Sequence, residues 1–344
     1  MRTLGDVAWK NVTASIDKGA VSVLQPPEGV NLKTRDRLAS IPGVEVREAV
    51  RLASVTTLRI GGPAEFFVRV ESEAALTEVL TVARKAALEL HLHGHGSNVL
   101  FPDGGMRGIV CRLRGELEQV EVEGETVRAG AGVTLARLAR DTAKQDLLGL
   151  EALSGFPSTV GGAVVMNAGC YGTEIGDVLA EVRVARPGQP VETLTTADLE
   201  PGYRTTNLQG TEAIVTRAEF RLRRGDGASA LERINELNRR RWESLPSGKP
   251  NAGSVFRNPE GDFAGRLIEA CGLKGATSGG AEISRRHANV IVNQENARAA
   301  DVLDLMITAH RAVRDRFNVE LRPEIVLAGD LADEFWRRTA APGI

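Results

Sequence analysis

Residues 89–100 read ELHLHGHGSNVL, and this stretch decides the fold because a short strand runs directly into a Gly-Ser-Asn turn. Such a turn offers several backbone N–H groups, with hydroxyl and amide donors, to an anion such as a diphosphate. Residues 153–172 read LSGFPSTVGGAVVMNAGCYG and are dense in Gly and Ala, so a large flat ligand can lie against their backbone. Glycine turns also serve hairpins and bulges, but two of them in one chain favour a ligand site.

A third segment, residues 251–263, reads NAGSVFRNPEGDF. Its Ser254 stands between Gly253 and a loop that ends in Pro259, and such a loop can hold a hydroxyl group where a reacting atom approaches. Ser254 is therefore the first candidate for chemistry. A loop of Asn, Gly, Ser and Pro with no further role is the alternative that this segment leaves open.

Strand and helix patterns alternate along the chain, which predicts an α/β or α+β protein. Residues 64–70 alternate like a strand, and Ser72 then begins a helix with one apolar face. Further strands are expected at 89–93, 109–113, 181–185, 213–222 and 287–293. Apolar residues from Val302 to Phe317 recur at helical spacing, which is typical of a core-facing helix. Residues 1–45 show little periodicity, so we expect a poorly ordered extension there.

Composition narrows the function classes. The chain has 344 residues, with 43 Lys and Arg against 45 Asp and Glu, so a net charge of −2 gives no electrostatic case for nucleic-acid binding. It has no apolar run long enough to span a bilayer, and its N-terminus lacks the apolar centre of a signal peptide, which favours the cytoplasm. Cys111, Cys170 and Cys271 form no CxxC pair, so neither a disulfide framework nor a metal site is indicated.

Six segments of the chain, in order and spacing, resemble the UDP-N-acetylenolpyruvoylglucosamine reductase (MurB) family. They are TTLRIGGPAEFFV (56–68), the Gly-Ser-Asn turn, PSTVGGAVVMNAGCYG (157–172), GYR (202–204), AGSVFRNP (252–259) and LRPEIVLAG (321–329). The resemblance covers about residues 45–330, and the short span between Glu212 and Ser254 indicates the shorter (type II) subtype. It implies an enzyme that uses non-covalent FAD and NADPH to reduce UDP-N-acetylglucosamine enolpyruvate to UDP-N-acetylmuramate for peptidoglycan.

The resemblance also implies an architecture. The class is α+β, with an FAD-binding fold of the vanillyl-alcohol-oxidase (PCMH) type, made of two α/β subdomains, and a C-terminal α/β substrate-binding domain. The first subdomain is expected at 46–112, the second at 113–225 with a return at 322–344, and the substrate-binding domain at 226–321, after the extension at 1–45. The expected partner is a small UDP-sugar enolpyruvyl ether, with a monomeric protein and no nucleic acid or membrane.

Three residues match the family's catalytic positions. Hydride must reach the terminal carbon of the enolpyruvyl group, while the carbon that bears the carboxylate collects negative charge and then a proton. The planar guanidinium of Arg204 suits that carboxylate. Glu324 would hold Arg204 or, when protonated, donate a hydrogen bond to the developing enolate, and Ser254 matches the proton donor. Without the resemblance, Arg204 and Glu324 would be interpreted as surface charges.

The resemblance assigns two further groups of residues to ligands. The flavin candidates are Arg59, Gly94, His95, Gly96, Ser97, Asn98, Pro157, Ser158, Val160, Gly161, Gly162 and Arg241. The candidates for the UDP-sugar are Tyr203, Asn258, Lys274 and His287. A core histidine and a solvated lysine are the alternatives for His287 and Lys274. No metal ligands are expected.

Two other functions stay open. The chain has His95 and Cys170 where the family usually has other residues, and some oxidases of the same fold tether flavin through a His and a Cys. A sugar or alcohol oxidase would use oxygen and would not need Ser254. A non-catalytic UDP-sugar-binding protein would not need the flavin turn. The chain also has Arg257 where the family often has lysine, which keeps the charge but changes the contact geometry.

Overall fold

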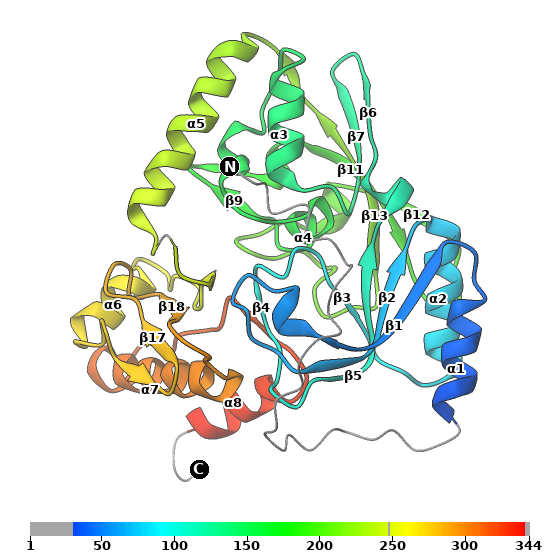
Figure 1. The fold of residues 1–344 in the computed structure, drawn as a ribbon. Helices are drawn as coiled ribbons and strands as arrows, with labels where there is room; N and C mark the ends of the chain where they lie inside the picture. Colours follow the sequence, from blue (N-terminus) through cyan, green and yellow to red (C-terminus); the bar gives the residue numbers. More distant parts are fainter. Residues whose placement is uncertain (1–29, 247, 341–344) are drawn as a thin grey trace.

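The computed structural model describes residues 30–246 and 248–340. This part of the chain forms three bodies, which Figure 1 shows at the lower right, at the top and at the lower left. They follow one another along the sequence, and each has its own sheet. Within the described residues, no helix combines the length and the apolar character that crossing a membrane requires.

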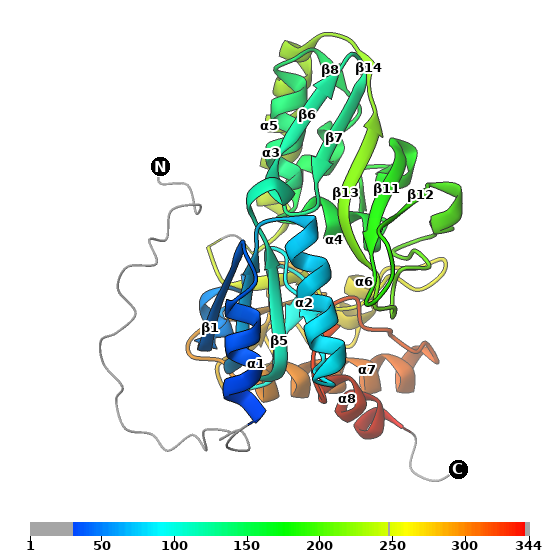
Figure 2. The same cartoon turned by 90° about the vertical axis from the view of Figure 1, so that its right-hand side faces the viewer.

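The first part is a four-stranded sheet with two helices on one face. In spatial order its strands are β1 (Val44–Arg51), β2 (Pro63–Val70), β5 (Met106–Leu113) and β3 (Leu90–Leu92). Strand β5 runs parallel to β2 and β3, whereas β1 is antiparallel to β2. Helices α1 (Val30–Ala39) and α2 (Glu73–Lys85) lie side by side on the sheet (Figure 2). The Ser72 hydroxyl accepts a hydrogen bond from the Ala75 N–H, which confirms the expected helix start.

The prediction of a poorly ordered extension is wrong for residues 30–45. They form α1 and the start of β1, and Leu38 and Ile41 are buried in the core under α2. Few apolar residues of this segment enter the core, so the sequence shows no clear helical period there. Residues 1–29 of the expected extension lie outside the described residues.

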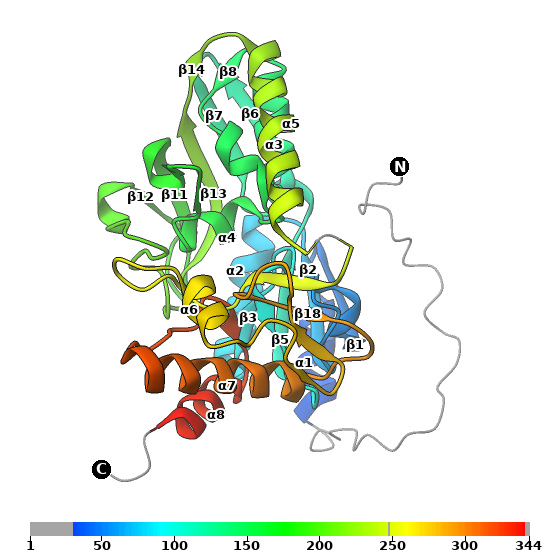
Figure 3. The same ribbon diagram turned by 90° about the vertical axis from the view of Figure 1, so that its left-hand side faces the viewer.

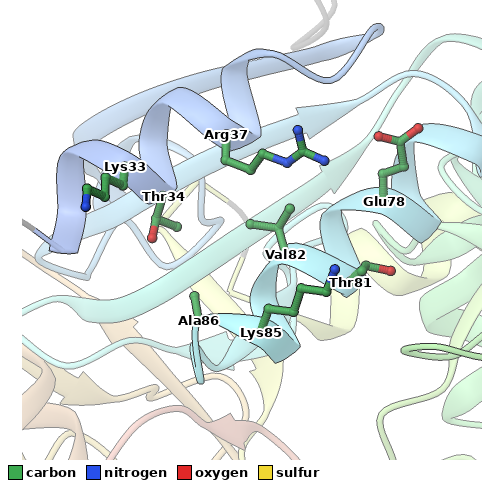
Figure 4. Close-up of a pocket in the computed structure, with 8 residues that line it drawn as sticks. All are labelled: Lys33, Thr34, Arg37, Glu78, Thr81, Val82, Lys85 and Ala86. Atoms are coloured by element: carbon green, nitrogen blue, oxygen red, sulfur yellow. The ribbon is translucent and has the colours of Figure 1, made fainter.

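A surface groove runs between α1 and α2 (Figure 4). Its lining residues are Lys33, Thr34, Arg37, Glu78, Thr81, Val82, Lys85 and Ala86. The groove belongs to the helix-covered side of the first sheet and shares no residue with the predicted site. It therefore has no part in the chemistry expected from the sequence.

The second part is a five-stranded antiparallel sheet. Its strands, in spatial order, are β12 (Glu192–Thr195), β11 (Leu179–Ala185), β13 (Ile214–Arg221), β7 (Thr126–Gly130) and β6 (Val120–Glu123). Strands β11 and β13 confirm those expected at 181–185 and 213–222. Two short strand pairs join this part: β8 (Leu147–Leu148) with β14 (Arg223–Arg224), and β9 (Gly169–Cys170) with β10 (Thr173–Glu174).

Three helices complete the second part: α3 (Leu135–Ala143), α4 (Val160–Val165) and α5 (Gly227–Ser244). Figure 3 shows α5 running alongside α3. Ala230 and Ile234 of α5 lie in the same hydrophobic core as Leu138 of α3. This packing differs from the expected domain boundary at residue 226, because the apolar face of α5 is buried against the second part.

The third part is a small sheet packed on helices. Its strands, in order, are β15 (Asn251–Ser254), β18 (Val290–Asn293), β17 (Ala281–Ile283) and β16 (Thr277–Ser278). Its helices are α6 (Ala264–Ala270), α7 (Ala299–Phe317) and α8 (Leu331–Thr339). The apolar stripe of α7, including Val302 and Met306, is buried in this core, as its spacing predicts.

The C-terminal strand and helix pack on the first and third parts and do not join the sheet of the second. Strand β19 (Val326–Leu327) pairs in parallel with β4 (Val99–Leu100), and Phe335 of α8 is buried against α7 and Phe256. This differs from the expected return of 322–344 to the sheet of 113–225. The physical reason is the apolar face of α8, which completes the core around α7. Residues 341–344 lie outside the described part.

Candidate active site

The turn after β3 has backbone donors that the described part of the protein leaves unpaired. Among the residues that the structure describes, none accepts a hydrogen bond from the N–H groups of Gly94 to Asn98. Gly96 has φ +68°, and a Cβ there would lie 2.5 Å from the Val55 carbonyl oxygen, so the turn requires glycine. Successive unpaired N–H groups make a concave anion site. The turn therefore fits the diphosphate of a dinucleotide such as FAD.

The second glycine-rich segment lies directly against this turn. A Cβ on Gly94 would lie 2.7 Å from the hydroxyl oxygen of Thr159, so the absence of a side chain allows the contact. The Thr159 hydroxyl in turn accepts a hydrogen bond from the Gly162 N–H. The structure thus brings together the two segments that are expected to contact the flavin. Pro157 and Gly162 are exposed there, and Ser158 is half-buried.

Val160 and Gly161 hold this segment in place. Both are buried, and their N–H groups donate to the carbonyl oxygens of Val133 at 2.8 Å and Ala131 at 2.9 Å. A Cβ on Gly161 would lie 2.9 Å from the Ala131 Cβ. These two backbone donors are therefore committed to the protein, so the residues can shape a flavin surface but not hydrogen-bond through their N–H groups.

Two side chains connect the turn to the third part. The Thr57 N–H donates to the Gly96 carbonyl oxygen at 3.0 Å. The Thr57 hydroxyl donates to the Asn251 carbonyl oxygen at 2.7 Å. The Asn98 amide donates to the Glu324 carbonyl oxygen at 3.1 Å. These bonds fix β15 and the segment before β19 beside the turn. Sequence reasoning missed the role of Thr57, because a hydroxyl bonded to distant backbone leaves no local pattern.

Ser254 is the last residue of β15, opposite Val290 of β18. The next residue, Val255, accepts a hydrogen bond on its carbonyl oxygen from the Glu324 N–H at 2.8 Å. Among the described residues, the Ser254 hydroxyl has no hydrogen-bond partner. Gly253 has φ +73°, with no atom within 4 Å of the place of a Cβ. The hydroxyl is therefore free to meet a ligand, one residue away from the backbone contact with Glu324.

Arg204 and Glu324 are in direct contact. Nε of Arg204 donates to Oε1 of Glu324 at 3.2 Å, while Nη2 donates to the Gly169 carbonyl oxygen at 2.9 Å. The two side chains are 22% and 20% exposed, so this is not a surface ion pair. The Arg204 guanidinium carbon also lies 5.1 Å from the ring centroid of Tyr203. The arginine is thereby held in one orientation with one edge committed to the protein.

The surroundings of Glu324 favour its neutral form. Burial raises the pKa of Glu324 above its ordinary value, while Arg204, Arg257 and Arg241 act in the opposite direction. Burial prevails because the carboxylate loses water that the arginines replace only in part. A carboxyl group with a raised pKa keeps its proton to higher pH and can donate a hydrogen bond. The side chain therefore fits the role of a neutral acid.

Arg241 reaches the site from the last turns of α5. Its Nη1 lies 3.9 Å from Sγ of Cys170, and its guanidinium carbon lies 5.9 Å from the Phe156 ring centroid. Its charge adds to the effect of burial on the pKa of His287, which is lowered, and opposes the effect of burial on the pKa of Glu324, which is raised. Arg241 therefore lies between the glycine-rich segment and the third part, close to the catalytic candidates.

Two of the substrate candidates hold helix α6. The Asn258 side-chain oxygen accepts a hydrogen bond from the Ala264 N–H, the first residue of the helix, at 3.1 Å. Nζ of Lys274 pairs with Oε1 of Glu269 on the same helix at 2.7 Å. The structure thus gives each residue a structural partner, and it places both around one helix.

His287 packs on the same helix. A Cβ on Gly265 of α6 would lie 3.2 Å from the His287 ring, and Nδ1 of that ring accepts a hydrogen bond from the Asn289 N–H at 3.3 Å. Burial, and then the charge of Lys274, lower the pKa of His287. The ring is therefore neutral at pH 7 and lies within the influence of both Lys274 and Arg241.

Two candidates remain at the surface. Arg59 is exposed at φ +56°, and its side chain makes no hydrogen bond or ion pair with the described residues. Tyr203 is 50% exposed. Across the described ranges, no group of three or more His, Cys, Asp or Glu side chains is placed to hold a metal ion.

Sequence reasoning also missed Asn289, which fixes the loop after Ser254. This buried side chain accepts a hydrogen bond from the Phe256 N–H at 3.0 Å and donates to the Phe256 carbonyl oxygen at 2.8 Å. A lone amide in front of the apolar run of HANVIVN was the available signal. In the same loop, Nε of Arg257 is buried without a hydrogen-bond partner among the described residues.

Comparison with known proteins agrees with this geometry. Residues 64–194 match the family model described as FAD binding domain, and residues 245–328 match that described as UDP-N-acetylenolpyruvoylglucosamine reductase, C-terminal domain. The chain is 44% identical over 297 residues to UDP-N-acetylenolpyruvoylglucosamine reductase 2 of Symbiobacterium thermophilum, covering 86% of this chain and 96% of that protein. It is 41% identical over 275 residues to the reductase of Geobacillus kaustophilus, covering 80% and 90%.

A solved structure shows the same architecture. The crystal structure of UDP-N-acetylenolpyruvylglucosamine reductase (MurB) from Thermus caldophilus superposes with a TM-score of 0.72 at 37% identity, covering 83% of this chain and 99% of that one. The expected α+β class, an FAD-binding fold followed by a separate C-terminal domain, is confirmed. The short chain fits the shorter subtype. The protein belongs to the UDP-N-acetylenolpyruvoylglucosamine reductase family.

Proposed function

We propose that the protein reduces UDP-N-acetylglucosamine enolpyruvate to UDP-N-acetylmuramate, with FAD as cofactor and NADPH as hydride donor, in the synthesis of peptidoglycan precursors. Family membership carries this proposal. The geometry that supports it best is the Arg204–Glu324 pair. The backbone of Glu324 is bonded to Val255, the residue after Ser254, and to the Asn98 amide of the turn whose N–H groups are unpaired among the described residues. That arrangement suits a reaction that adds hydride and a proton next to a carboxylate.

We assign FAD binding to the first and second parts. Bound FAD supplies a carrier that accepts two electrons from the nicotinamide and passes them to the enolpyruvyl double bond. The turn at 94–98 suits its diphosphate because its N–H groups are free, and the segment at 157–162 suits its ring because little side chain covers the backbone. The remaining proposed flavin contacts are the side chains of His95, Ser97, Asn98, Arg59 and Arg241.

We assign the chemical step to three side chains of this chain. Arg204 orients the substrate carboxylate and stabilises the negative charge that develops on it. Glu324 holds Arg204 and, in its neutral form, donates a hydrogen bond to the enolate oxygen. Ser254 gives its hydroxyl proton to the carbon that bears the carboxylate. The oxidase alternative gives no purpose to this free hydroxyl, whose neighbour Val255 is bonded to the backbone of Glu324.

We assign the UDP-sugar to the third part, with Tyr203 from the second part at its entrance. The other proposed contacts, Asn258, Lys274 and His287, surround α6. Arg204, Arg241, Arg257 and Lys274 together supply positive charge for a ligand that carries a diphosphate and a carboxylate. A UDP-sugar and NADPH are cytoplasmic metabolites, so we place the enzyme in the cytoplasm. We also propose that it is a monomer without nucleic-acid partners.

A visible spectrum of the purified protein tests the function. We expect a yellow protein that is bleached by NADPH without oxygen and regains its colour when the enolpyruvyl substrate is added. The product should contain two more hydrogen atoms than the substrate by mass spectrometry. A colourless protein that binds UDP-sugars would support a non-catalytic role instead. Fast recovery of colour with oxygen but not with substrate would support an oxidase.

The same protein tests the form of the cofactor. If FAD is bound without a covalent bond, acid precipitation should release all the yellow colour into the supernatant. Colour that stays with the precipitate would indicate a tether through His95 or Cys170 and would contradict the proposed cofactor.

A further inference from the structure

One arginine beside the 94–98 turn has no partner among the residues that the structure describes. Arg112 lies near the end of β5, in register with Arg69 of the neighbouring β2. The third arginine close by is Arg114. Arg69 pairs with Glu45 at 3.1 Å and Arg114 pairs with Glu118 at 2.6 Å. Among the described residues, the Arg112 guanidinium has neither a hydrogen bond nor an ion pair.

The strand pairing places this arginine next to the residue that precedes the turn. Strands β3 and β5 are parallel, with Leu92 opposite Cys111, and the pairing continues because the His93 N–H donates to the Cys111 carbonyl oxygen at 2.7 Å. Arg112 is therefore opposite His93, the residue before the turn. After burial, the charge of Arg112 is the next cause that lowers the pKa of His93 and of His95, in agreement with this register.

Arg112 supplies positive charge beside a turn whose own histidines are neutral. Burial lowers the pKa of His93 to about 3 and that of His95 below its ordinary value, so both rings are neutral at pH 7. Burial and the two neighbouring arginines lower the pKa of Arg112 to about 10, which still leaves it charged at pH 7. An unpaired, half-buried cation is unfavourable in the free protein, and an anion bound at the turn would remove that penalty.

We propose that Arg112 is a cofactor-binding residue that pairs with a phosphate of the FAD diphosphate held by the N–H groups of residues 94–98. The proposal rests on the proposed function, in that FAD occupies this turn. The guanidinium adds charge-assisted hydrogen bonds to a turn whose own donors, the backbone N–H groups and the Ser97 and Asn98 side chains, are neutral. It also gives the site a preference for a dinucleotide over a flavin without phosphate.

The test is a titration of the deflavinated full-length protein with FAD and with riboflavin, followed by flavin fluorescence. We expect Arg112→Gln to raise the Kd for FAD by about tenfold to a hundredfold and to leave the much weaker riboflavin binding within about twofold. Arg112→Lys, which keeps the charge, should have a Kd for FAD between those of the parent and of Arg112→Gln. Arg107→Gln, on the exposed face of the same strand, is the matched control and should leave both Kd values unchanged.

Thermal unfolding separates this role from a structural one. Without FAD, Arg112→Gln should melt at the same temperature as the parent or higher, because an unpaired cation is removed; with FAD it should gain less stability than the parent. A lower melting temperature without FAD together with an unchanged Kd would overturn the proposal, and so would an equal loss of FAD and riboflavin binding. A parent protein that binds no FAD would instead overturn the proposed function.

Discussion

At the scale of the residue, Glu324 shows how burial and charge compete. Three arginines act to keep it ionised, yet burial raises its pKa, so the neutral acid persists above the usual range. If the neutral form is the active one, kcat should fall as pH rises through this raised pKa. The same shift makes the free energy of unfolding fall as pH rises from the ordinary pKa of a glutamate to the raised pKa of Glu324. In that range the folded protein keeps the proton that the unfolded chain has lost.

We expect Glu324→Gln to abolish this alkaline fall in kcat, since an amide donates a hydrogen bond at every pH. Its kcat at low pH should be reduced by about tenfold to a hundredfold, because the amide is a weaker stabiliser of the enolate. The measurement is kcat against pH for both proteins. An alkaline limb that persists unchanged in Glu324→Gln would assign it to another group.

Arg204 makes two contacts at once, from Nε to Glu324 and from Nη2 to the Gly169 carbonyl oxygen. The single nitrogen of a lysine cannot reproduce this fork. We expect Arg204→Lys to slow the oxidation of the reduced protein by the enolpyruvyl substrate, while its reduction by NADPH changes less. Arg107→Lys is the control. Equal losses in both half-reactions, seen in stopped-flow traces, would place Arg204 at the flavin or the nicotinamide.

Ser254 has a hydroxyl that the described part of the protein leaves unpaired. If it donates the final proton, Ser254→Ala should be reduced by NADPH at nearly the parent rate, because that step needs no proton on the substrate carbon. Oxidation of the reduced protein by substrate should slow by at least about a hundredfold, with partial recovery in Ser254→Cys. Ser278→Ala, in β16 of the same sheet, is the control. A Ser254→Ala protein oxidised at the parent rate would leave Ser254 a loop residue.

At the scale of the element, the sequence predicted what periodicity controls. The helix after Ser72, the strands β5, β11 and β13, and the buried stripe of α7 have clear apolar patterns, and the structure confirms them. Helix α1 was missed because few of its residues enter the core. The pairing of β19 with β4 was missed because each strand has two residues and the partners are more than two hundred positions apart.

The candidate site divides in the same way. Motifs predicted the Arg204–Glu324 contact, since both residues lie in recognisable segments. The bond of Thr57 runs from an ordinary polar side chain to a distant backbone atom, and one sequence carries no signal for such a contact. For Asn289 the only signal was a lone amide before an apolar run, and that signal does not name the partner. Arg112 was missed for another reason: an arginine in a strand is unremarkable until its neighbours are known to be paired.

The turn after β3 depends on one glycine. A side chain at Gly96 would meet the Val55 carbonyl oxygen at 2.5 Å and would require φ +68°. We expect Gly96→Ala to lose most of its bound FAD and to be destabilised by about 1–3 kcal/mol. Gly104→Ala is the control, because no atom lies within 4 Å of the place of its Cβ. Normal flavin content and melting temperature in Gly96→Ala would show that the turn can change shape without cost.

At the scale of the whole molecule, the site depends on contacts between three parts of the chain. The turn belongs to the first part, Arg204 and Arg241 to the second, and Ser254 to the third, while the segment of Glu324 connects the third part to the first (Figure 1). Hydrogen bonds from Thr57 and Asn98 cross these boundaries. The stability of the first part should therefore determine how well the second and third parts are positioned to form the site.

Two N-terminal deletions test where that stability begins. Residues 1–29 contain none of the family segments, and the described core begins at Leu38, so their removal should leave flavin content and turnover nearly unchanged. Removal of residues 1–43 also takes α1 away, exposing the sheet where Leu38 and Ile41 are buried. At about 1.5–3 kcal/mol for each buried side chain, the melting temperature and the yield of flavin-loaded protein should fall clearly. Equal loss in the shorter deletion would show that residues 1–29 contribute to the fold, and no loss in the longer one would show that α1 is dispensable.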